Sequence, residues 1–356
     1  LLKVYSVPGG NSHLPFSSGC IGYFSYDLCR LIEKIPGRST DDINMPDIML
    51  GFYNSAIIID HKDNQAYISL SSAGLPPSAA RRDVMGKIIR EIDREMERET
   101  ETGAAGQNTL THRCDEYAQL SHAPASNHTR ESYCNMVAKA KEYIRNGDIY
   151  QVNLSQRFET AFSGDPYIIF EKLRRRCPVP FSAYLNFDDI KVISGSPERF
   201  IKINGREIET RPIKGTRPRG KTPDEDASLR QELLCSEKDR AELTLIIDLE
   251  RNDLGKICEM GSVKVKSFYD VEEYSNVFHL VSTITGRLKN GIDFADCLKA
   301  VFPGGSITGA PKIRAMEIID ELEPVRRGVY TGSIGYIGFD GNADLNIAIR
   351  TLTAKN

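Results

Sequence analysis

The stretch Ile334-Gly335-Tyr336-Ile337-Gly338-Phe339-Asp340-Gly341-Asn342, followed by the apolar residues 345–352, decides the expected fold class. Asp-Gly-Asn between two apolar runs is a strong β-hairpin signal, because Gly and Asn accept the positive φ angles of tight turns. A second hairpin with a longer loop is predicted where residues 57–59 and 66–70 flank a polar segment. Because helical patterns lie between such hairpins, we expect an α+β fold rather than a parallel βαβ repeat.

Two helices and one more strand are predicted from periodicity. Residues 78–99 repeat apolar side chains every fourth position, and a second helix is expected from Thr129, as N-cap, to Gly147. The expected apolar stripes are Val84, Ile88, Ile92 and Met96 in the first helix, and Tyr133, Val137, Ala140 and Ile144 in the second. Residues 181–187 alternate with period two, as in a half-buried strand. The polar segment 101–127 is the predicted linker.

The composition excludes several classes of protein. The 356 residues are 40% hydrophobic and 27% charged, with a formal net charge of −3, so the basic excess of a nucleic-acid-binding protein is lacking. No apolar run is long enough to span a bilayer, and no signal peptide is recognisable. The eight cysteines are scattered without a Cys-x-x-Cys pair. We therefore expect reduced thiols in a cytoplasmic protein that binds neither nucleic acid nor membrane.

The segment 236–249 is predicted to be a helix that carries carboxylates on its apolar side. Ser236 and Asp239 form a plausible capping box. At about 100° per residue, Glu242 falls near the middle of the apolar arc, and Asp239 lies on the same side one turn earlier. A carboxylate that faces a core must be paired, protonated or bound to metal. A structural ion pair and a Mg²⁺ site both satisfy this requirement.

Lys214 lies in a basic stretch, for which a solvated surface loop is the simplest interpretation. However, Pro212-Ile213 precedes it and Gly215 follows it, which indicates a fixed backbone close to another group. The turn 195–199 supplies Glu198. A lysine and a glutamate that share a pocket can act as nucleophile and general acid–base.

Residues 302–312, Phe-Pro-Gly-Gly-Ser-Ile-Thr-Gly-Ala-Pro-Lys, are predicted to form a loop with Thr308 as the N-cap of a following helix. A capped helix alone explains the pattern. The glycines, the hydroxyl and Lys312 favour an anion site at the helix start instead, for a carboxylate or a phosphate.

Several of these segments resemble the chorismate-utilising enzymes, in order from about Phe16 to the C-terminus. The matching motifs are residues 147–154, 196–200, 211–216, 238–253, 279–283, 303–312 and 347–351. The resemblance implies one α+β domain over residues 1–356, in which two antiparallel-rich β-sheets pack face to face with helices outside. Residues 1–128 would form an N-terminal subregion and 129–356 the catalytic, chorismate-binding region. The C-terminal end is expected to be incomplete, because the family carries a second Mg²⁺ glutamate beyond the last motif. The N-terminal subregion is also expected to be incomplete, because its opening portion is short for the family.

Two positions distinguish branches of this family. Anthranilate synthases are similar except for alanine in place of Lys214, and isochorismate-type enzymes carry a water-activating lysine in place of Gln151. The combination found here resembles bacterial aminodeoxychorismate synthases, which implies amination of C4 through a Lys214 adduct, with Glu198 as general acid. By motif position, the substrate-binding residues would be Gly215, Thr216, His279, Thr308, Tyr330 and Arg350. Glu242, and less directly Asp239, would hold Mg²⁺.

The resemblance also implies partners. A glutamine amidotransferase subunit would supply ammonia, and the product would feed p-aminobenzoate and folate synthesis. Some members bind tryptophan near the motif that corresponds to Pro180, Phe181 and Ser182. The alternatives are an anthranilate synthase component I and a non-catalytic member of the family.

Overall fold

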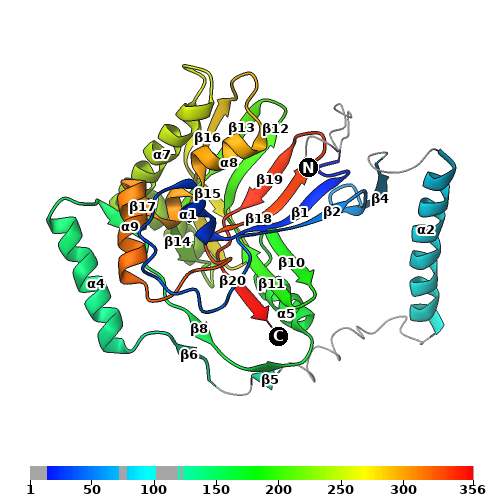
Figure 1. Cartoon of the computed structure of the whole chain (residues 1–356), viewed down its shortest axis with the longest axis horizontal. Helices are drawn as coiled ribbons and strands as arrows, with labels where there is room; N and C mark the ends of the chain where they lie inside the picture. Colours follow the sequence, from blue (N-terminus) through cyan, green and yellow to red (C-terminus); the bar gives the residue numbers. More distant parts are fainter. Residues whose placement is uncertain (1–13, 72–77, 102–118, 121–122, 356) are drawn as a thin grey trace.

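The computed structural model describes residues 14–71, 78–101, 119–120 and 123–355. Most of the predicted linker lies outside these ranges. The described chain forms two main sheets with helices around them, together with four two-stranded pairs (Figure 1).

The larger sheet has nine strands, and every pairing in it is antiparallel. Its main path runs β14 (Ile213–Pro218), β16 (Val277–Arg287), β13 (Glu207–Arg211), β12 (Arg199–Asn204), β19 (Ala343–Asn346), β18 (Ser333–Gly338), β1 (Gly19–Phe24) and β2 (Ile48–Tyr53). The ninth strand, β15 (Lys264–Glu273), also pairs with β16. The smaller sheet contains β10 (Phe181–Phe187), β11 (Ile190–Ser196) and β20 (Thr351–Lys355), again antiparallel. The expected α+β class is confirmed.

The two faces of the large sheet bury different partners, as strand alternation requires. Tyr23 of β1 and Ile334 of β18 join Val192 of the small sheet in one apolar cluster. Phe24 and Ile337, on the opposite face, join the cluster formed with the helices. One face therefore packs on the small sheet, and the other face packs on helices.

The C-terminal hairpin is only partly as predicted. β18 and β19 pair across the Asp-Gly-Asn turn, which confirms the predicted turn and the first of the two predicted strands. The expected second strand, 345–352, is interrupted: β19 ends at Asn346, and β20 begins at Thr351 in the other sheet. Arg350, with a φ of 51°, lies in this break. Residues 347–350 thus cross from one sheet to the other.

The helices that shape the candidate site lie on the helical face of the large sheet. α7 (Glu237–Ile257) begins after Ser236, whose side chain accepts the Asp239 amide as predicted. It packs with α8 (Phe294–Val301), and α9 (Lys312–Leu322) follows the short 3-10 helix η2 (Gly305–Ile307). Further helices in the described ranges include η1 (Tyr26–Leu28), α1 (Cys29–Ile32), α5 (Pro166–Arg176) and α6 (Pro223–Cys235).

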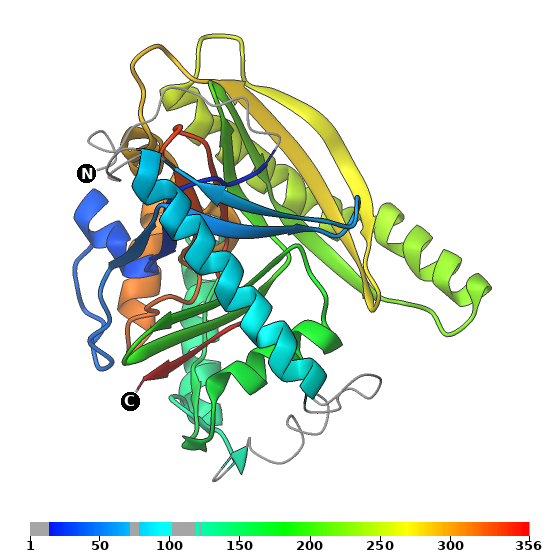
Figure 2. The same ribbon diagram turned by 90° about the vertical axis from the view of Figure 1, so that its right-hand side faces the viewer.

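Both helices predicted from periodicity exist. α2 (Ser78–Glu101) lies at one end of the molecule, beside the confirmed hairpin of β3 (Ser55–Asp60) and β4 (Gln65–Leu70) (Figures 1 and 2). α4 (Arg130–Arg145) lies at the other end, with Thr129 as its N-cap. Its predicted stripe is displaced, because Met136 and Ala140 are buried whereas Ile144 is 42% exposed. None of the helices in the described ranges could cross a membrane.

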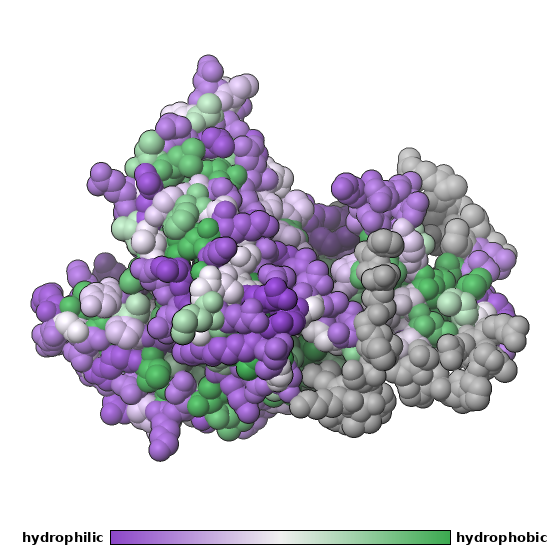
Figure 3. Space-filling view, turned by 90° about the horizontal axis from the view of Figure 1, so that it is seen from above, coloured by the Kyte–Doolittle hydropathy of each residue, from purple (hydrophilic) through white to green (hydrophobic). Residues whose placement is uncertain are grey.

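Short strand pairs complete the fold. β7 (Gln151–Val152) pairs with β17 (Gly309–Ala310), β5 (Gln119–Leu120) with β9 (Phe162–Ser163), and β6 (Ala125–Ser126) with β8 (Phe158–Glu159). The face seen in Figure 3 is mostly hydrophilic, with apolar residues in separate groups.

Candidate active site

Lys214 and Glu198 meet at the loop that contains Ser306. The Lys214 Nζ donates a hydrogen bond to the Ser306 carbonyl oxygen over 2.8 Å. The Ser306 hydroxyl hydrogen-bonds to the Glu198 carboxyl group, which also accepts the Ile213 amide at 3.4 Å. Residues that are distant in sequence therefore place an amine and a carboxyl group around one backbone turn.

Burial makes Glu198 a suitable proton donor. Glu198 lies between β11 and β12, directly before the first residue of β12, and it is 4% exposed. Burial raises its pKa, while the Ser306 hydroxyl, the Lys214 charge and the Ile213 amide oppose that rise. Desolvation prevails because a carboxylate in a low-dielectric site lacks its hydration. The carboxyl group thus holds its proton to a higher pH than an exposed glutamate does.

Thr216 and His279 form a second pair beside Lys214. They lie opposite each other on β14 and β16, and Thr216 Oγ1 is 2.9 Å from His279 Nδ1. His279 is 2% exposed, and its Nε2 has no partner within the described chain. Burial, and secondarily the nearby Arg350 charge, lowers its pKa to about 4. The imidazole is therefore neutral at pH 7, with one nitrogen available to a ligand.

Gly215 allows β14 to approach α7. Its φ is +87°, and a Cβ there would lie 2.9 Å from the Asp239 Cβ. Any side chain would be strained and would collide with the helix. The first turn of α7 is consequently held directly behind Lys214 and Thr216.

Arg350 and Tyr330, like Thr216, are exposed members of the predicted substrate-binding set. Arg350 is exposed, and Nη1 donates to the Cys177 Sγ at 3.3 Å. No carboxylate of the described residues lies within ion-pair distance of Arg350, so its guanidinium can still bind an anion. Tyr330 is 38% exposed, and burial of its ring raises its pKa.

Two expectations about the loop 302–312 are wrong. Thr308 does not cap the following helix: α9 begins at Lys312 after Pro311, and the Thr308 hydroxyl bonds instead to the carbonyls of Gly304 and Gly305. Lys312 does not offer its charge to a bound anion, because its Nζ already pairs with the Asp253 carboxylate and donates to the Val301 and Pro303 carbonyls. The buried ion pair between Lys312 and Asp253 therefore fixes the start of the loop 302–312 against α7.

The expected orientation of Glu242 is also wrong. Its side chain is 38% exposed, and its Oε1 lies 3.9 Å from the Lys238 Nζ. The buried acids of α7 are Glu250 and Asp253, because the core stripe continues through Leu243, Ile247, Glu250, Leu254 and Ile257 at spacings of three and four. The sequence contains this longer stripe, but the prediction used only residues 236–249 and therefore placed the buried face of the helix incorrectly.

The carboxylates of α7 fit a hard cation in part. Glu242 offers open oxygens, as Mg²⁺ requires from one or two protein carboxylates. Asp239 fits less well, because Arg217 already binds it at 3.1 Å. Three or more potential ligands do not cluster anywhere in the described ranges.

Ser306 and Glu250 were missed by the sequence analysis. Ser306 touches both Lys214 and Glu198, and Glu250 accepts the Gly305 amide next to it. Pro180, Phe181 and Ser182 lie where β10 begins, and Phe181 pairs with Ser196, two residues before Glu198. The Arg199 guanidinium covers the Phe181 ring, with its Cζ 5.2 Å from the centroid.

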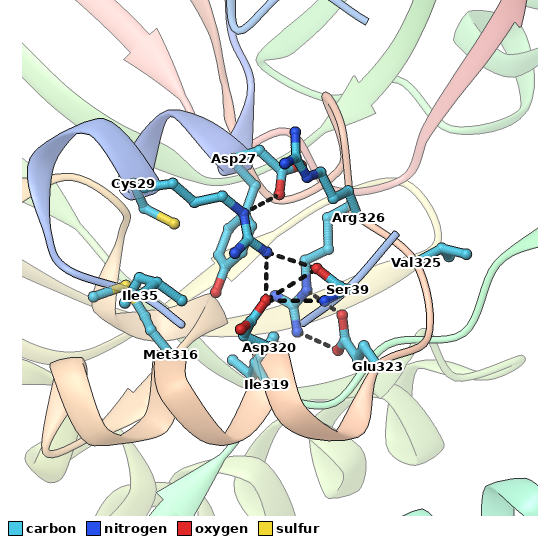
Figure 4. A pocket seen from close by; sticks show the side chains of 13 residues that line it. Asp27, Cys29, Ile35, Ser39, Met316, Ile319, Asp320, Glu323, Val325 and Arg326 are labelled. Atoms are coloured by element: carbon cyan, nitrogen blue, oxygen red, sulfur yellow. Dashed lines mark hydrogen bonds and ion pairs between the residues drawn. The ribbon is translucent and has the colours of Figure 1, made fainter. Parts of the chain in front are cut away.

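A separate small pocket lies between residues 26–39 and α9 (Figure 4). Arg30 bridges Asp27 and Asp320, and Arg327 binds Glu323. Arg327 also donates to the Ile307 and Asn153 carbonyls. Because its charged groups already neutralise one another, this pocket is a buried ion-pair network that supports η2.

The chain is similar to known proteins over almost its whole length. The chain is 46% identical to aminodeoxychorismate synthase component 1 of Klebsiella aerogenes, over 98% of this chain and 71% of that protein. It is 41% identical to anthranilate synthase component 1 of Aquifex aeolicus, over 98% and 69%. The crystal structure of anthranilate synthase component I from Streptococcus pneumoniae TIGR4 superposes with a TM-score of 0.85 at 34% identity, covering 100% of this chain and 77% of that one. The family of chorismate binding enzymes matches residues 6–356, and the chain belongs to that family.

Proposed function

We propose that this chain is the chorismate-aminating subunit of an aminodeoxychorismate synthase. The observation that carries the proposal is the amine of Lys214 beside the buried, proton-holding Glu198 around Ser306. The names of the relatives support the same activity, since aminodeoxychorismate synthase component 1 from four bacteria is 42–46% identical to this chain.

In the first half-reaction, the nitrogen lone pair of the Lys214 amine adds to C2 of the chorismate ring. The two ring double bonds shift toward C4, and the C4 hydroxyl leaves as water with the proton of Glu198. The Glu198 carboxylate then takes the extra proton from the new secondary amine. One C–N bond has formed and one C–O bond has broken, so no oxidant or reductant is needed.

In the second half-reaction, ammonia adds to C4. The double bonds return to their original places, and the bond from C2 to Lys214 breaks. Glu198 relays a proton from the incoming nitrogen to the departing lysine. The products are 4-amino-4-deoxychorismate and the free enzyme.

The remaining residues hold the substrate. Arg350 suits a carboxylate of chorismate, because a guanidinium binds carboxylates with two parallel hydrogen bonds. His279 can hydrogen-bond a ring substituent without adding charge, since it is neutral. Mg²⁺, held through Glu242, would offset the negative charge of the ring carboxylate when bound.

Ammonia would come from a glutamine amidotransferase subunit. The relatives are called component 1, which supports the existence of a second component. The proposal assigns the glutaminase activity to that component. The product would supply p-aminobenzoate and folate synthesis.

Anthranilate synthase component I is the second candidate, favoured by the relative from Aquifex aeolicus at 41% identity. The test is to incubate the full-length protein with chorismate, Mg²⁺ and ammonium, and to identify the product by chromatography. We expect 4-amino-4-deoxychorismate. Anthranilate would instead support the second candidate, and no product would indicate a non-catalytic member.

A further inference from the structure

Glu250 is a buried acid that the proposed reaction does not use. It lies on the core stripe of α7, is 3% exposed, and accepts the Gly305 amide through Oε1 at 3.0 Å. Its Oε2 is buried without a hydrogen-bond partner among the described residues. An apolar side chain would stabilise this helix position better, because burial of an acid costs free energy.

Its neighbour Asp253 differs in this respect. Asp253 is equally buried, but Lys256 and Lys312 both form ion pairs with it. No cation in the described ranges lies within ion-pair distance of Glu250, and burial raises its pKa. The acid at this position is therefore not explained by an ion pair.

The backbone of η2 is fitted closely to α7. A Cβ on Gly305 would lie 2.6 Å from the Leu249 Cδ2 and 3.0 Å from the Glu250 Oε1. Glycine thus allows the Gly305 amide to reach the Glu250 carboxyl group. The next residue is Ser306, whose carbonyl accepts Lys214 and whose hydroxyl binds Glu198.

We propose that Glu250 is a positioning residue: its carboxyl oxygen fixes η2, and through Ser306 it sets the placement of Lys214 relative to Glu198. This rests on the function proposed above. The carboxyl group acts as a hydrogen-bond acceptor, and its charge is not required. Glutamine, which has the same acceptor oxygen, should therefore replace it.

The test compares Glu250→Gln with Glu250→Met and Glu250→Leu, which remove the acceptor. Steady-state kinetics use chorismate, Mg²⁺ and ammonium. We expect the apolar variants to lose about tenfold to a hundredfold in kcat, as for a displaced catalytic group, with KM nearly unchanged. Glu250→Gln should retain kcat within about threefold of the wild type. The control is Glu171→Met, which removes another buried glutamate, 5% exposed and on α5; it should leave kcat unchanged.

A second measurement does not depend on turnover. Acetylation of the Lys214 amine by acetic anhydride, which releases acetate, is followed by peptide mass spectrometry. It should be several-fold faster in Glu250→Met or Glu250→Leu, because the hydrogen bond from Lys214 to Ser306 is loosened. Unchanged acetylation and kcat in the apolar variants would overturn the proposal. So would an equal loss in Glu250→Gln, or an equal loss in Glu171→Met. If the wild type makes anthranilate instead, the proposed function fails, while the acetylation rates still decide the role of Glu250.

Discussion

His279 offers a quantitative check of the buried electrostatics of the site. Its pKa is lowered to about 4 in the folded protein, against an ordinary value of 6.5. Between these two values the unfolded chain binds a proton that the folded chain does not. The free energy of unfolding must therefore decrease as the pH falls from 6.5 toward 4. The full effect is about 3 kcal/mol, and from pH 7.5 to pH 5 it is about 2 kcal/mol.

The perturbation is His279→Gln, which removes the titrating group but keeps a polar side chain. Urea unfolding at pH 7.5 and at pH 5 gives the free energy of unfolding of each protein. The wild type should lose about 2 kcal/mol more than the variant. Carboxylates titrate in both proteins and cancel in the difference. His61→Gln, in the exposed turn between β3 and β4, should behave like the wild type. Equal losses in the wild type and His279→Gln would refute the buried, neutral imidazole.

Two further predictions concern the catalytic acid and the network beneath it. Glu198→Gln should lower kcat about 10²-fold to 10⁴-fold, measured by product formation with ammonium. In the wild type, kcat should fall as the pH rises through the raised pKa of Glu198, because the carboxyl group then loses the proton that it donates. A flat alkaline limb would contradict that role. Arg327→Met should destabilise the protein by about 3–5 kcal/mol in urea unfolding, because Glu323 is left buried without its partner. Adding Glu323→Leu should recover much of the loss, and a double variant no more stable than the single one would count against a simple ion pair.

Local signals predicted local structure well. The Asp-Gly-Asn turn, the hairpin of β3 and β4, and the caps at Thr129 and Ser236 all depend on neighbours within a few residues. The break between β19 and β20 depends on distant partners. The Ile347 amide donates to the Glu198 backbone carbonyl, and the Arg350 carbonyl accepts from the Gly195 amide. Periodicity within one segment carries no information about such contacts.

The candidate site divides in the same way. Lys214 and Glu198 were identified from their motifs, and antiparallel pairing of β12 with β13 explains how they come together. Ser306 and Glu250 act through a backbone carbonyl and a backbone amide, which no residue pattern identifies. The orientation of Glu242 was wrong because the core stripe of α7 is set by the whole helix.

The central claim is that Lys214 becomes covalently bound to the substrate. Protein incubated with chorismate and Mg²⁺, without ammonium, is denatured rapidly, digested and analysed by mass spectrometry. The peptide containing Lys214 should gain the mass of chorismate minus one water, and ammonium should remove this addition. An unmodified Lys214, in protein that forms 4-amino-4-deoxychorismate once ammonium is added, would contradict the claim.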